Sequence, residues 1–327
     1  MTEKLRWAIM GPGKITLTIV HDFALVGIKF DAVGSRSLER ATTYASEHSI
    51  PKAYGSYEDL VADPDLDVIY IATTHNAHFE NAKLALNAGK HVLLEKSFTL
   101  DANQAKQLAA LAEQKNVFLM EAMWTRFLPN HVSLFEKIAE GIIGNPLYVI
   151  ADHNQYIPKT KAPRLHDPAL GGGSLLDVGI YPISFAHRVF GKPEKIQATA
   201  SLMPGNIDES VAAIFEYSGG RQALIHSSIR VKGPVRAFVM GDKGRIELEK
   251  QFYEHGSFTV YNLDDQEIFR YEGNIEGRGM QYQALEVERC IRAGLRQSPV
   301  MSLDETIEIM EVMDQIRQQT GIEYSGV

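Results

Sequence analysis

Leu5-Arg6-Trp7-Ala8-Ile9-Met10-Gly11-Pro12-Gly13 is a short, largely apolar run that ends in a glycine turn. Apolar residues follow it at helical spacing, so the stretch predicts a strand, a tight turn and a helix with one buried face. Such a turn lets the backbone approach a pyrophosphate, and the helix start offers free N–H groups and the positive end of the helix dipole. The residues expected to contact a dinucleotide here are Gly11, Pro12, Gly13, Lys14 and Ile15.

The glycine fingerprint is incomplete, because Thr16 stands where the third residue of G-x-G-x-x-G is usually Gly or Ala. Threonine is larger than either, so we expect the first helix and first strand to lie slightly farther apart. The turn therefore supports dinucleotide binding without settling it.

The end of the second predicted strand, residues 30–34, bears on which dinucleotide is bound. Proteins that bind NAD usually place Asp or Glu there, where it binds the ribose 2′-hydroxyl. This chain has Ser35-Arg36-Ser37 instead. A hydroxyl and a guanidinium suit a 2′-phosphate, which Arg can grip as a charged fork. Ser35 and Arg36 therefore predict NADP rather than NAD; the alternative is that Arg36 is only an exposed residue at a helix start.

Strands and helices then alternate up to about residue 120. Helices are expected over residues 38–48, 57–62, 77–88 and 101–115, and strands over 67–72, 91–94 and 117–120. This alternation predicts a doubly wound parallel sheet, in which ligands bind at the carboxyl ends of the strands. The residues at those ends that we expect to line the cofactor cleft are Thr73, Thr74, His75, Asn76, His78, Glu95 and Lys96.

Lys96 is the candidate catalytic residue of this half, because it follows an apolar strand and is expected to face the cofactor cleft. A lysine beside a phenol favours the phenolate and can also hydrogen-bond a substrate oxygen. The alternative is a structural ion pair with Glu95. His75 and His78 lie three residues apart, but the spacing offers no further ligand, so no metal site is expected.

A second glycine-rich stretch, Gly171-Gly172-Gly173-Ser174-Leu175-Leu176-Asp177-Val178-Gly179-Ile180-Tyr181-Pro182, points to acid–base chemistry. Ser174 can cap a helix that places Asp177 and Tyr181 one turn apart on the same face. Glycines beside them would let a ligand approach the backbone closely. The pair is therefore a candidate catalytic dyad; the alternative is a glycine turn with a surface Asp and an interfacial Tyr.

The C-terminal half predicts an α+β domain. Helices are expected over 124–140 and from about 174 to 190, and turn signals then separate successive strands from 196 to 271 before two final helices. We expect a large, mostly antiparallel open sheet. The predicted domains are an NADP-binding domain over 1–123 and a substrate-binding and oligomerisation domain over 124–327. A broad open sheet face suggests a homodimer through that sheet.

Composition limits the possible partners. The net charge of −8 argues against non-specific nucleic-acid binding, which needs a basic surface. The single cysteine, Cys290, permits no intrachain disulfide and fits a reducing compartment. Met1 leads almost directly into a strand, and no apolar run approaches the ~18 residues of a membrane helix. We therefore expect no signal peptide, no membrane contact and a cytoplasmic location.

Taken together, these motifs resemble the Gfo/Idh/MocA (glucose–fructose oxidoreductase / inositol dehydrogenase) family over the whole chain, and its dimeric dihydrodiol dehydrogenases and NADP-dependent xylose dehydrogenases most of all. The motifs that carry the resemblance are Gly11-Pro12-Gly13, Glu95-Lys96-Ser97, Glu121-Ala122-Met123-Trp124-Thr125-Arg126-Phe127 with Pro129, and residues 171–182. The resemblance implies a Rossmann domain followed by an α+β domain, often dimeric through its open sheet.

The resemblance also implies residue roles. Lys96 would bind substrate and tune the acid–base residue, Tyr181 would be that residue, and Asp177 would assist it. Trp124 and Arg126 match positions that line the cofactor site. The chain departs from the pattern at Ser97 and Thr74, where the family commonly has proline.

We therefore expect an NADP-dependent dehydrogenase that moves a hydride between the nicotinamide and a hydroxyl-bearing carbon of a sugar, polyol or cyclic diol. The expected substrate contacts are Lys96, Asp177, Tyr181 and Tyr156, the last from the polar segment 153–166. One alternative is a reductase of a non-sugar carbonyl or conjugated ring with the same cofactor. Another is a non-catalytic NADP-binding regulator, against which the presence of all three catalytic candidates argues.

Overall fold

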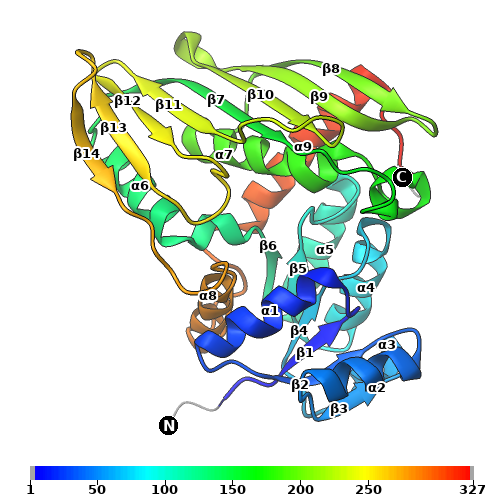
Figure 1. Cartoon of the computed structure of the whole chain (residues 1–327). Coiled ribbons are helices and arrows are strands. Elements are labelled where there is room, and N and C mark those ends of the chain that lie inside the picture. Colours follow the sequence, from blue (N-terminus) through cyan, green and yellow to red (C-terminus); the bar gives the residue numbers. More distant parts are fainter. Residues whose placement is uncertain (1–3, 325–327) are drawn as a thin grey trace. The chain divides into compact units, whose positions relative to one another are not determined.

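The structure is a computed structural model that describes residues 4–324 (Figure 1). Residues 1–3, part of the N-terminal segment expected to lack a signal peptide, lie outside the described residues. The chain divides into two units. The first comprises Met1–Phe127 and Glu276–Ile307, and the second Leu128–Ile275 and Glu308–Val327.

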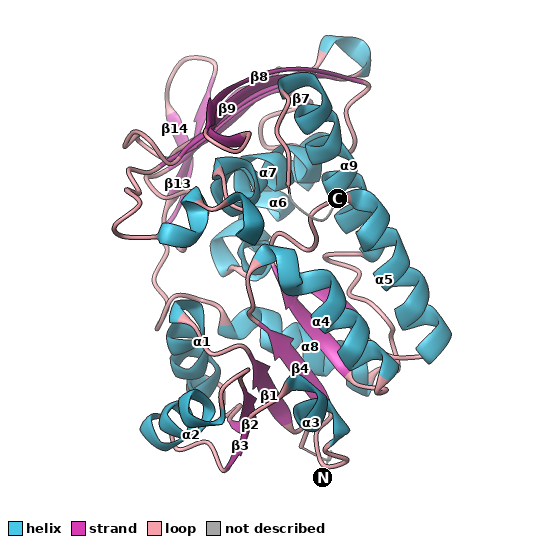
Figure 2. Ribbon diagram, turned by 90° about the vertical axis from the view of Figure 1, so that its right-hand side faces the viewer, coloured by secondary structure: helices cyan, strands magenta, loops and turns pink. Residues whose placement is uncertain are grey.

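The sheet of the first unit has six parallel strands in the order β3-β2-β1-β4-β5-β6, which confirms the predicted doubly wound Rossmann sheet. Helices pack on both of its faces (Figure 2). Because all strands run the same way, their carboxyl ends meet at one edge. The strands are β1 Trp7–Met10, β2 Phe30–Gly34, β3 Lys52–Tyr54, β4 Val68–Ile71, β5 His91–Glu95 and β6 Leu119–Ala122.

Some helices of the first unit begin where a polar side chain accepts a backbone N–H group. Ser37, Ser56 and Asp101 each accept the N–H three residues on, as N-caps do. Asp101 was the predicted start of its helix, and its Oδ1 accepts from Gln104 N at 2.7 Å. The helices are α1 Lys14–Leu25, α2 Leu38–Glu47, α3 Tyr57–Ala62, α4 His75–Asn87, α5 Ala102–Lys115 and α8 Gln281–Arg292.

Residues 276–307 belong to the first unit, although the predicted boundary at 123/124 places them in the second domain. Long-range hydrogen bonds explain the difference. Trp7 Nε1 in β1 donates to Glu288 Oε1 in α8 at 3.2 Å. The buried Asp22 carboxylate of α1 accepts the N–H groups of Arg278 and Met280, each at 3.0 Å. The chain therefore returns to complete the first unit, which no local sequence pattern signals.

The second unit is built on one eight-stranded sheet in the order β14-β13-β12-β11-β7-β10-β9-β8. Among the strands of residues 4–324, the β7–β10 pair is the only parallel pair of this sheet, which confirms the predicted mostly antiparallel sheet. The strands are β7 Pro146–Asn154, β8 Lys195–Met203, β9 Ile207–Glu216, β10 Gln222–Ser228, β11 Ala237–Gly241, β12 Gly244–Leu248, β13 Phe258–Asn262 and β14 Glu267–Tyr271.

Helices cover one face of this sheet (Figure 1). They are α6 Pro129–Ala139, α7 Ile180–Phe190 and the second unit's part of α9, which runs over Leu303–Thr320. Side chains alternate accordingly: Val149 and Ala151 of β7 are buried, whereas Tyr148 and Ile150 are 44% and 42% exposed. The opposite face therefore presents apolar side chains to its surroundings.

Two helices expected to be continuous are interrupted. Residues 124–140 form a 3₁₀ turn, Trp124–Phe127, and then α6, because Leu128 is extended before Pro129. The helix expected from about 174 begins as a π-helix, Leu175–Gly179, before α7. π-Turns are rare and are found most often at functional sites. Within the described residues, no helix is both long and apolar enough to cross a membrane.

Candidate active site

The turn after β1 has the room that a dinucleotide needs. Gly11 has φ +88°, and a Cβ added there would lie 2.7 Å from Thr73 Cγ2, so the turn requires glycine. A Cβ added at Gly13 would meet no atom within 4 Å, so the backbone is open at that point. Lys14 and Ile15 follow at the N-terminus of α1. A pyrophosphate fits this open turn and helix start.

Thr16, the residue that departs from the glycine fingerprint, holds the same turn. Its Oγ1 donates to Gly13 O at 2.7 Å and accepts the Gly13 N–H at 3.1 Å. The hydroxyl of Tyr44 in α2 donates to Thr16 Oγ1 at 2.8 Å. Thr16 therefore ties the start of α1 to α2 as well as replacing the usual small residue.

Two arginines mark the end of β2. Arg36 is exposed after the buried Ser35, and Arg40 in α2 donates through Nη2 to Pro12 O at 3.4 Å. Burial raises the pKa of Tyr57, and the charges of both arginines oppose that rise. The sequence predicted Arg36 but missed Arg40, whose position four residues later in α2 was the available signal.

The residues after β4 connect to the loop after β5. His78 is buried, and its ring nitrogens lie 2.9 Å from Ser97 O and 3.2 Å from Thr73 O. Burial lowers the pKa of His78 to about 4, so the ring is neutral near pH 7 and only one of its nitrogens carries a hydrogen to donate. His75 lies against it with ring centroids 5.5 Å apart, and Thr74 Oγ1 donates to Asn76 Oδ1 at 2.7 Å.

Lys96 stands at the carboxyl end of β5, as predicted. The preceding Glu95 is buried and accepts from the Tyr70 hydroxyl at 2.5 Å and from Lys96 N at 3.2 Å. Burial raises the pKa of Glu95, and the charge of Lys96 opposes this rise. The Lys96–Ser97 peptide bond is cis.

A second buried carboxylate holds the residue after this loop. Glu121 Oε1 accepts Phe98 N–H at 3.1 Å, and Oε2 accepts from Thr306 Oγ1 at 3.2 Å. Burial raises the pKa of Glu121 to about 7. Glu121 therefore ties the Lys96 loop to the start of α9.

The two motif residues after β6 are both buried. Arg126 Nη1 donates to Glu305 Oε1 at 2.7 Å, and the Arg278 guanidinium lies 5.0 Å from the centre of the Trp124 ring. Both partners belong to segment 276–307, so this segment supports the residues that the resemblance assigns to the cofactor site.

The second unit carries the other two catalytic candidates at the junction of the π-helix and α7. Asp177 Oδ1 accepts from Arg164 Nη2 at 2.7 Å. Tyr181 is buried, and its ring centroid lies 5.1 Å from that of His153 and 4.8 Å from that of Tyr253. The chosen candidates are thus divided, with Lys96 in the first unit and Asp177 and Tyr181 in the second.

Polar groups surround the Tyr181 ring. His153 and Tyr253 stack with centroids 4.2 Å apart. Gln155 Nε2 donates to the Tyr253 hydroxyl at 3.1 Å and lies 2.8 Å from His153 Nε2. Tyr156, the predicted substrate contact, directly follows Gln155 in the sequence, and its side chain is 62% exposed. The sequence named the segment that holds His153 but missed Tyr253, because the loop before β13 carries no chemical motif.

Gly172 and Gly173 are required by close contacts within the chain. A Cβ added at Gly172 would lie 2.8 Å from the carbonyl oxygens of Leu165 and Asp167. A Cβ added at Gly173, which has φ +101°, would lie 2.3 Å from Asp208 Oδ1. In the described part of the chain, no three His, Cys, Asp or Glu side chains gather as a metal site.

Family models match both halves of the chain. The model described as "Oxidoreductase family, NAD-binding Rossmann fold" matches residues 5–123, and the "GFO/IDH/MocA C-terminal domain" matches residues 131–247. Among curated proteins, the trans-1,2-dihydrobenzene-1,2-diol dehydrogenase of Xenopus tropicalis is 36% identical over 328 residues, covering 98% of this chain and 99% of that protein. The human protein of the same name is 34% identical over 334 residues, with 98% of each chain covered.

Solved structures share the fold. The aldose–aldose oxidoreductase from Caulobacter crescentus, complexed with glycerol, superposes with a TM-score of 0.87 at 24% identity, covering 98% of each chain. A 3-ketoreductase from Actinomadura kijaniata with NADP and TDP-benzene gives 0.86 at 21% identity, covering 97% of this chain and 98% of that one. At these identities the likeness establishes the fold alone.

The buried Glu121 predicts a pH-dependent stability. Because burial raises its pKa to about 7 from an ordinary 4.5, the folded protein holds this proton more tightly than the unfolded chain does. The stabilisation is complete below pH 4.5 and is lost as pH rises to about 7, a loss of about 3 kcal/mol. Glu121→Gln should remove this dependence.

The measurement is the free energy of unfolding in urea at a series of pH values. The difference between Glu121→Gln and wild type should grow in favour of the variant across that window and then level off. Glu113→Gln, on the exposed face of α5, is the control and should follow wild type. A difference that stays constant with pH would show that Glu121 does not titrate as described.

Proposed function

The chain belongs to the Gfo/Idh/MocA family of NAD(P)-binding oxidoreductases, and from that premise we propose a cytoplasmic, NADP-dependent enzyme that transfers a hydride to or from a sugar, polyol or cyclic diol. The observation that carries the proposal is the buried Tyr181 phenol within the polar cluster of His153, Gln155 and Tyr253. A phenol so placed can exchange a proton with a substrate hydroxyl.

The preference for NADP rests on Arg36 and Arg40. No acidic side chain stands at the end of β2, where an NAD-binding protein needs one. The two guanidinium groups carry the positive charge that suits a 2′-phosphate. Arg40 also contacts the phosphate turn through Pro12, so the two ends of the dinucleotide site are linked.

The cofactor, when bound, supplies the hydride acceptor or donor, and this chain's residues supply alignment and proton transfer. In the oxidation direction Tyr181 takes the hydroxyl proton, and in the reduction direction it returns the proton to the carbonyl oxygen. Lys96 hydrogen-bonds the substrate oxygen. Asp177, paired with Arg164, orients the substrate. Gly11, Pro12 and Gly13 hold the pyrophosphate.

The Tyr181 cluster favours a substrate that is both cyclic and hydroxylated. The rings of His153, Tyr181 and Tyr253 pack together, and Gln155 and the Tyr253 hydroxyl add polar groups to the cluster. The curated relatives act, by name, on a cyclic diol. A reductase of a non-sugar carbonyl or conjugated ring would use the same residues with Tyr181 as the acid. A non-catalytic NADP-binding regulator would need neither Lys96 nor Tyr181.

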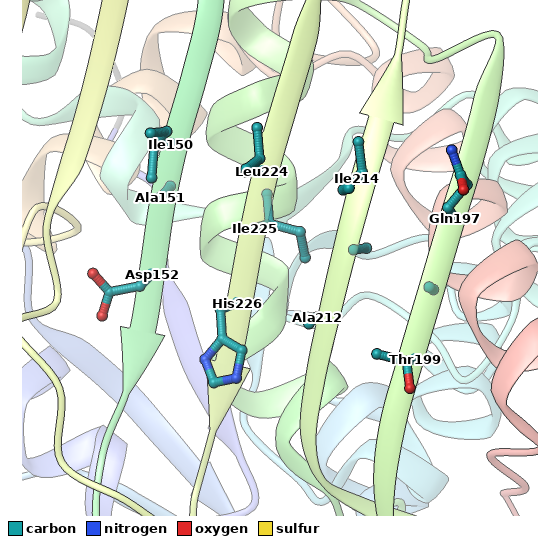
Figure 3. Close-up of a pocket in the computed structure, with 12 residues that line it drawn as sticks. Ile150, Ala151, Asp152, Gln197, Thr199, Ala212, Ile214, Leu224, Ile225 and His226 are labelled. Carbon is teal, nitrogen blue, oxygen red and sulfur yellow. The ribbon is translucent and has the colours of Figure 1, made fainter.

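We also propose that two copies pair through the uncovered face of the eight-stranded sheet. That face holds an open groove of about 480 Å³ across β7, β8, β9 and β10 (Figure 3). Ile150, Leu224 and Ile214 line it and are 42%, 40% and 39% exposed. An apolar patch of this kind, edged by polar residues, is typical of a protein interface, and a two-fold axis would bring two equal patches together.

Tyr181→Phe tests the catalytic proposal. Removing only the hydroxyl should lower kcat by about a hundredfold or more, because proton transfer is lost, while the Kd for NADPH stays unchanged. The assay is turnover with NADP across aldoses, polyols and trans-dihydrodiols, with simple ketones and conjugated rings run in reverse with NADPH. Tyr261→Phe, on β13, is the matched control.

Loss of NADPH binding together with activity would make Tyr181 structural, and unchanged turnover would remove it from the chemistry. Turnover of ketones or conjugated rings alone would support the alternative reductase. Tight NADPH binding with no turnover of any compound would support the regulator.

Arg36→Ala and Arg40→Ala test the cofactor preference. Each loses a charged contact with the 2′-phosphate, so the Kd for NADPH should rise roughly tenfold to a hundredfold while the Kd for NADH hardly changes. Tryptophan fluorescence titration with both cofactors measures this. Arg289→Ala, exposed on α8, is the control. Wild type that binds NADH as well as or better than NADPH would contradict the proposal.

Leu224→Asp tests the dimer. A charge at the centre of the apolar groove should convert a wild-type dimer to monomer in sedimentation velocity, because two buried carboxylates would face each other unpaired. Leu263→Asp, in the 72%-exposed position of the β13–β14 turn, should leave the dimer intact. A monomeric wild type, or a variant that remains dimeric, would place the interface elsewhere or exclude it.

A further inference from the structure

A register shift in β9 turns Asp208 into the interior of the second unit. Ser210 pairs with Ser201 and Asp208 pairs with Leu202, so Glu209 is the extra residue of a bulge. An extra residue in a strand changes the alternation of side chains, so residues on its two sides no longer follow one in-and-out pattern. Asp208 is accordingly fully buried, whereas Ser210, two residues away, is half-buried.

The Asp208 carboxylate meets the first residues of the helix that carries Tyr181. Its Oδ2 accepts Ser174 N–H at 3.0 Å, Leu175 N–H at 2.8 Å and the Ser174 hydroxyl at 2.5 Å. These groups stand at the start of the π-helix, where backbone donors lack partners within the helix. A negative charge there also complements the helix dipole.

Neighbouring residues accommodate this contact. A Cβ at Gly173 would lie 2.3 Å from Asp208 Oδ1, so glycine is required beside the carboxylate. Ser227 of β10 supports the same turn, since its Oγ lies 3.2 Å from Ser174 Oγ and a Cβ at Gly179 would lie 3.0 Å from it. Asp208 and Ser227 of the sheet therefore contact the start of the π-helix, and Ser227 also lies close to its last residue, Gly179.

The π-helix runs directly into α7, and Tyr181 is the second residue of α7. Because no loop separates the π-helix from α7, the position of the first turn of the π-helix also determines the position of Tyr181. We propose that Asp208 is a positioning residue for Tyr181: its carboxylate anchors the start of the π-helix and so sets where the phenol lies. This inference rests on the proposed role of Tyr181 as the acid–base residue.

The charge state of Asp208 agrees with an anchoring role. Burial raises its pKa to about 6, and its hydrogen bonds with Ser174 and Leu175 oppose the rise. Near pH 7 it is therefore ionised and accepts charge-assisted hydrogen bonds, which are stronger than neutral ones.

The test is Asp208→Asn, which keeps the side-chain size but removes the charge. Amide hydrogen exchange, read by mass spectrometry, should be roughly tenfold to a hundredfold faster in the peptide spanning residues 174–181. With the best substrate of the panel, kcat should fall about tenfold to a hundredfold because of misplacement, with KM and NADPH binding unchanged. Asp242→Asn, which loses a carboxylate that accepts Asn145 N–H elsewhere in the second unit, should change neither.

Ser174→Ala carries the same test if Asp208→Asn does not fold, because it removes only the hydroxyl donor and should show the same changes to a smaller degree. Unchanged exchange in residues 174–181 would overturn the anchor. Faster exchange with unchanged kcat would overturn the positioning role. A wild type that turns over no compound would refute the proposed function instead, and faster exchange in Asp208→Asn would still support the anchor.

Discussion

Parallel pairing of β1 with β2 and β4 is the constraint on which the first unit depends. It brings the ends of these strands to one edge and sets the β1–α1 turn beside Thr73 at the end of β4. Because the turn is so close to Thr73, Gly11 must be glycine. The residues expected to contact the dinucleotide lie near this edge, so the direction of the strands determines where the cofactor binds.

Buried carboxylates then fix the segments that carry the candidate chemistry. Glu95 and Glu121 accept the N–H groups of Lys96 and Phe98, on either side of Ser97. Asp208 accepts those of Ser174 and Leu175 ahead of Tyr181. An ionised group is costly to bury, and in each case hydrogen bonds from the chain oppose the rise in its pKa. Both units therefore contain buried carboxylates that accept backbone N–H groups close in sequence to the candidate catalytic residues Lys96, Asp177 and Tyr181.

The sequence predicted what local patterns determine. The strand, glycine turn and α1, the alternation that follows, the start of α5 at Asp101 and the mostly antiparallel second sheet are all confirmed. Contacts between distant residues were not predictable. Apolar spacing did not distinguish the π-turn at 175–179 from α-helix, and nothing near Asp208 shows that a bulge buries it. Segment 276–307 has an ordinary helical pattern, and its contacts with distant residues, among them the hydrogen bonds to Trp7 and Asp22, assign it to the first unit.

Direct hydride transfer between substrate and nicotinamide is tested most directly with isotope. A panel substrate deuterated at its hydroxyl-bearing carbon is incubated with NADP and the enzyme, and the reduced cofactor is examined by NMR. The proposed chemistry predicts deuterium at a single face of nicotinamide C4, together with a slower rate than for the protonated substrate. Reduced cofactor without deuterium, or no reduced cofactor from any substrate, would contradict a hydride-transferring enzyme.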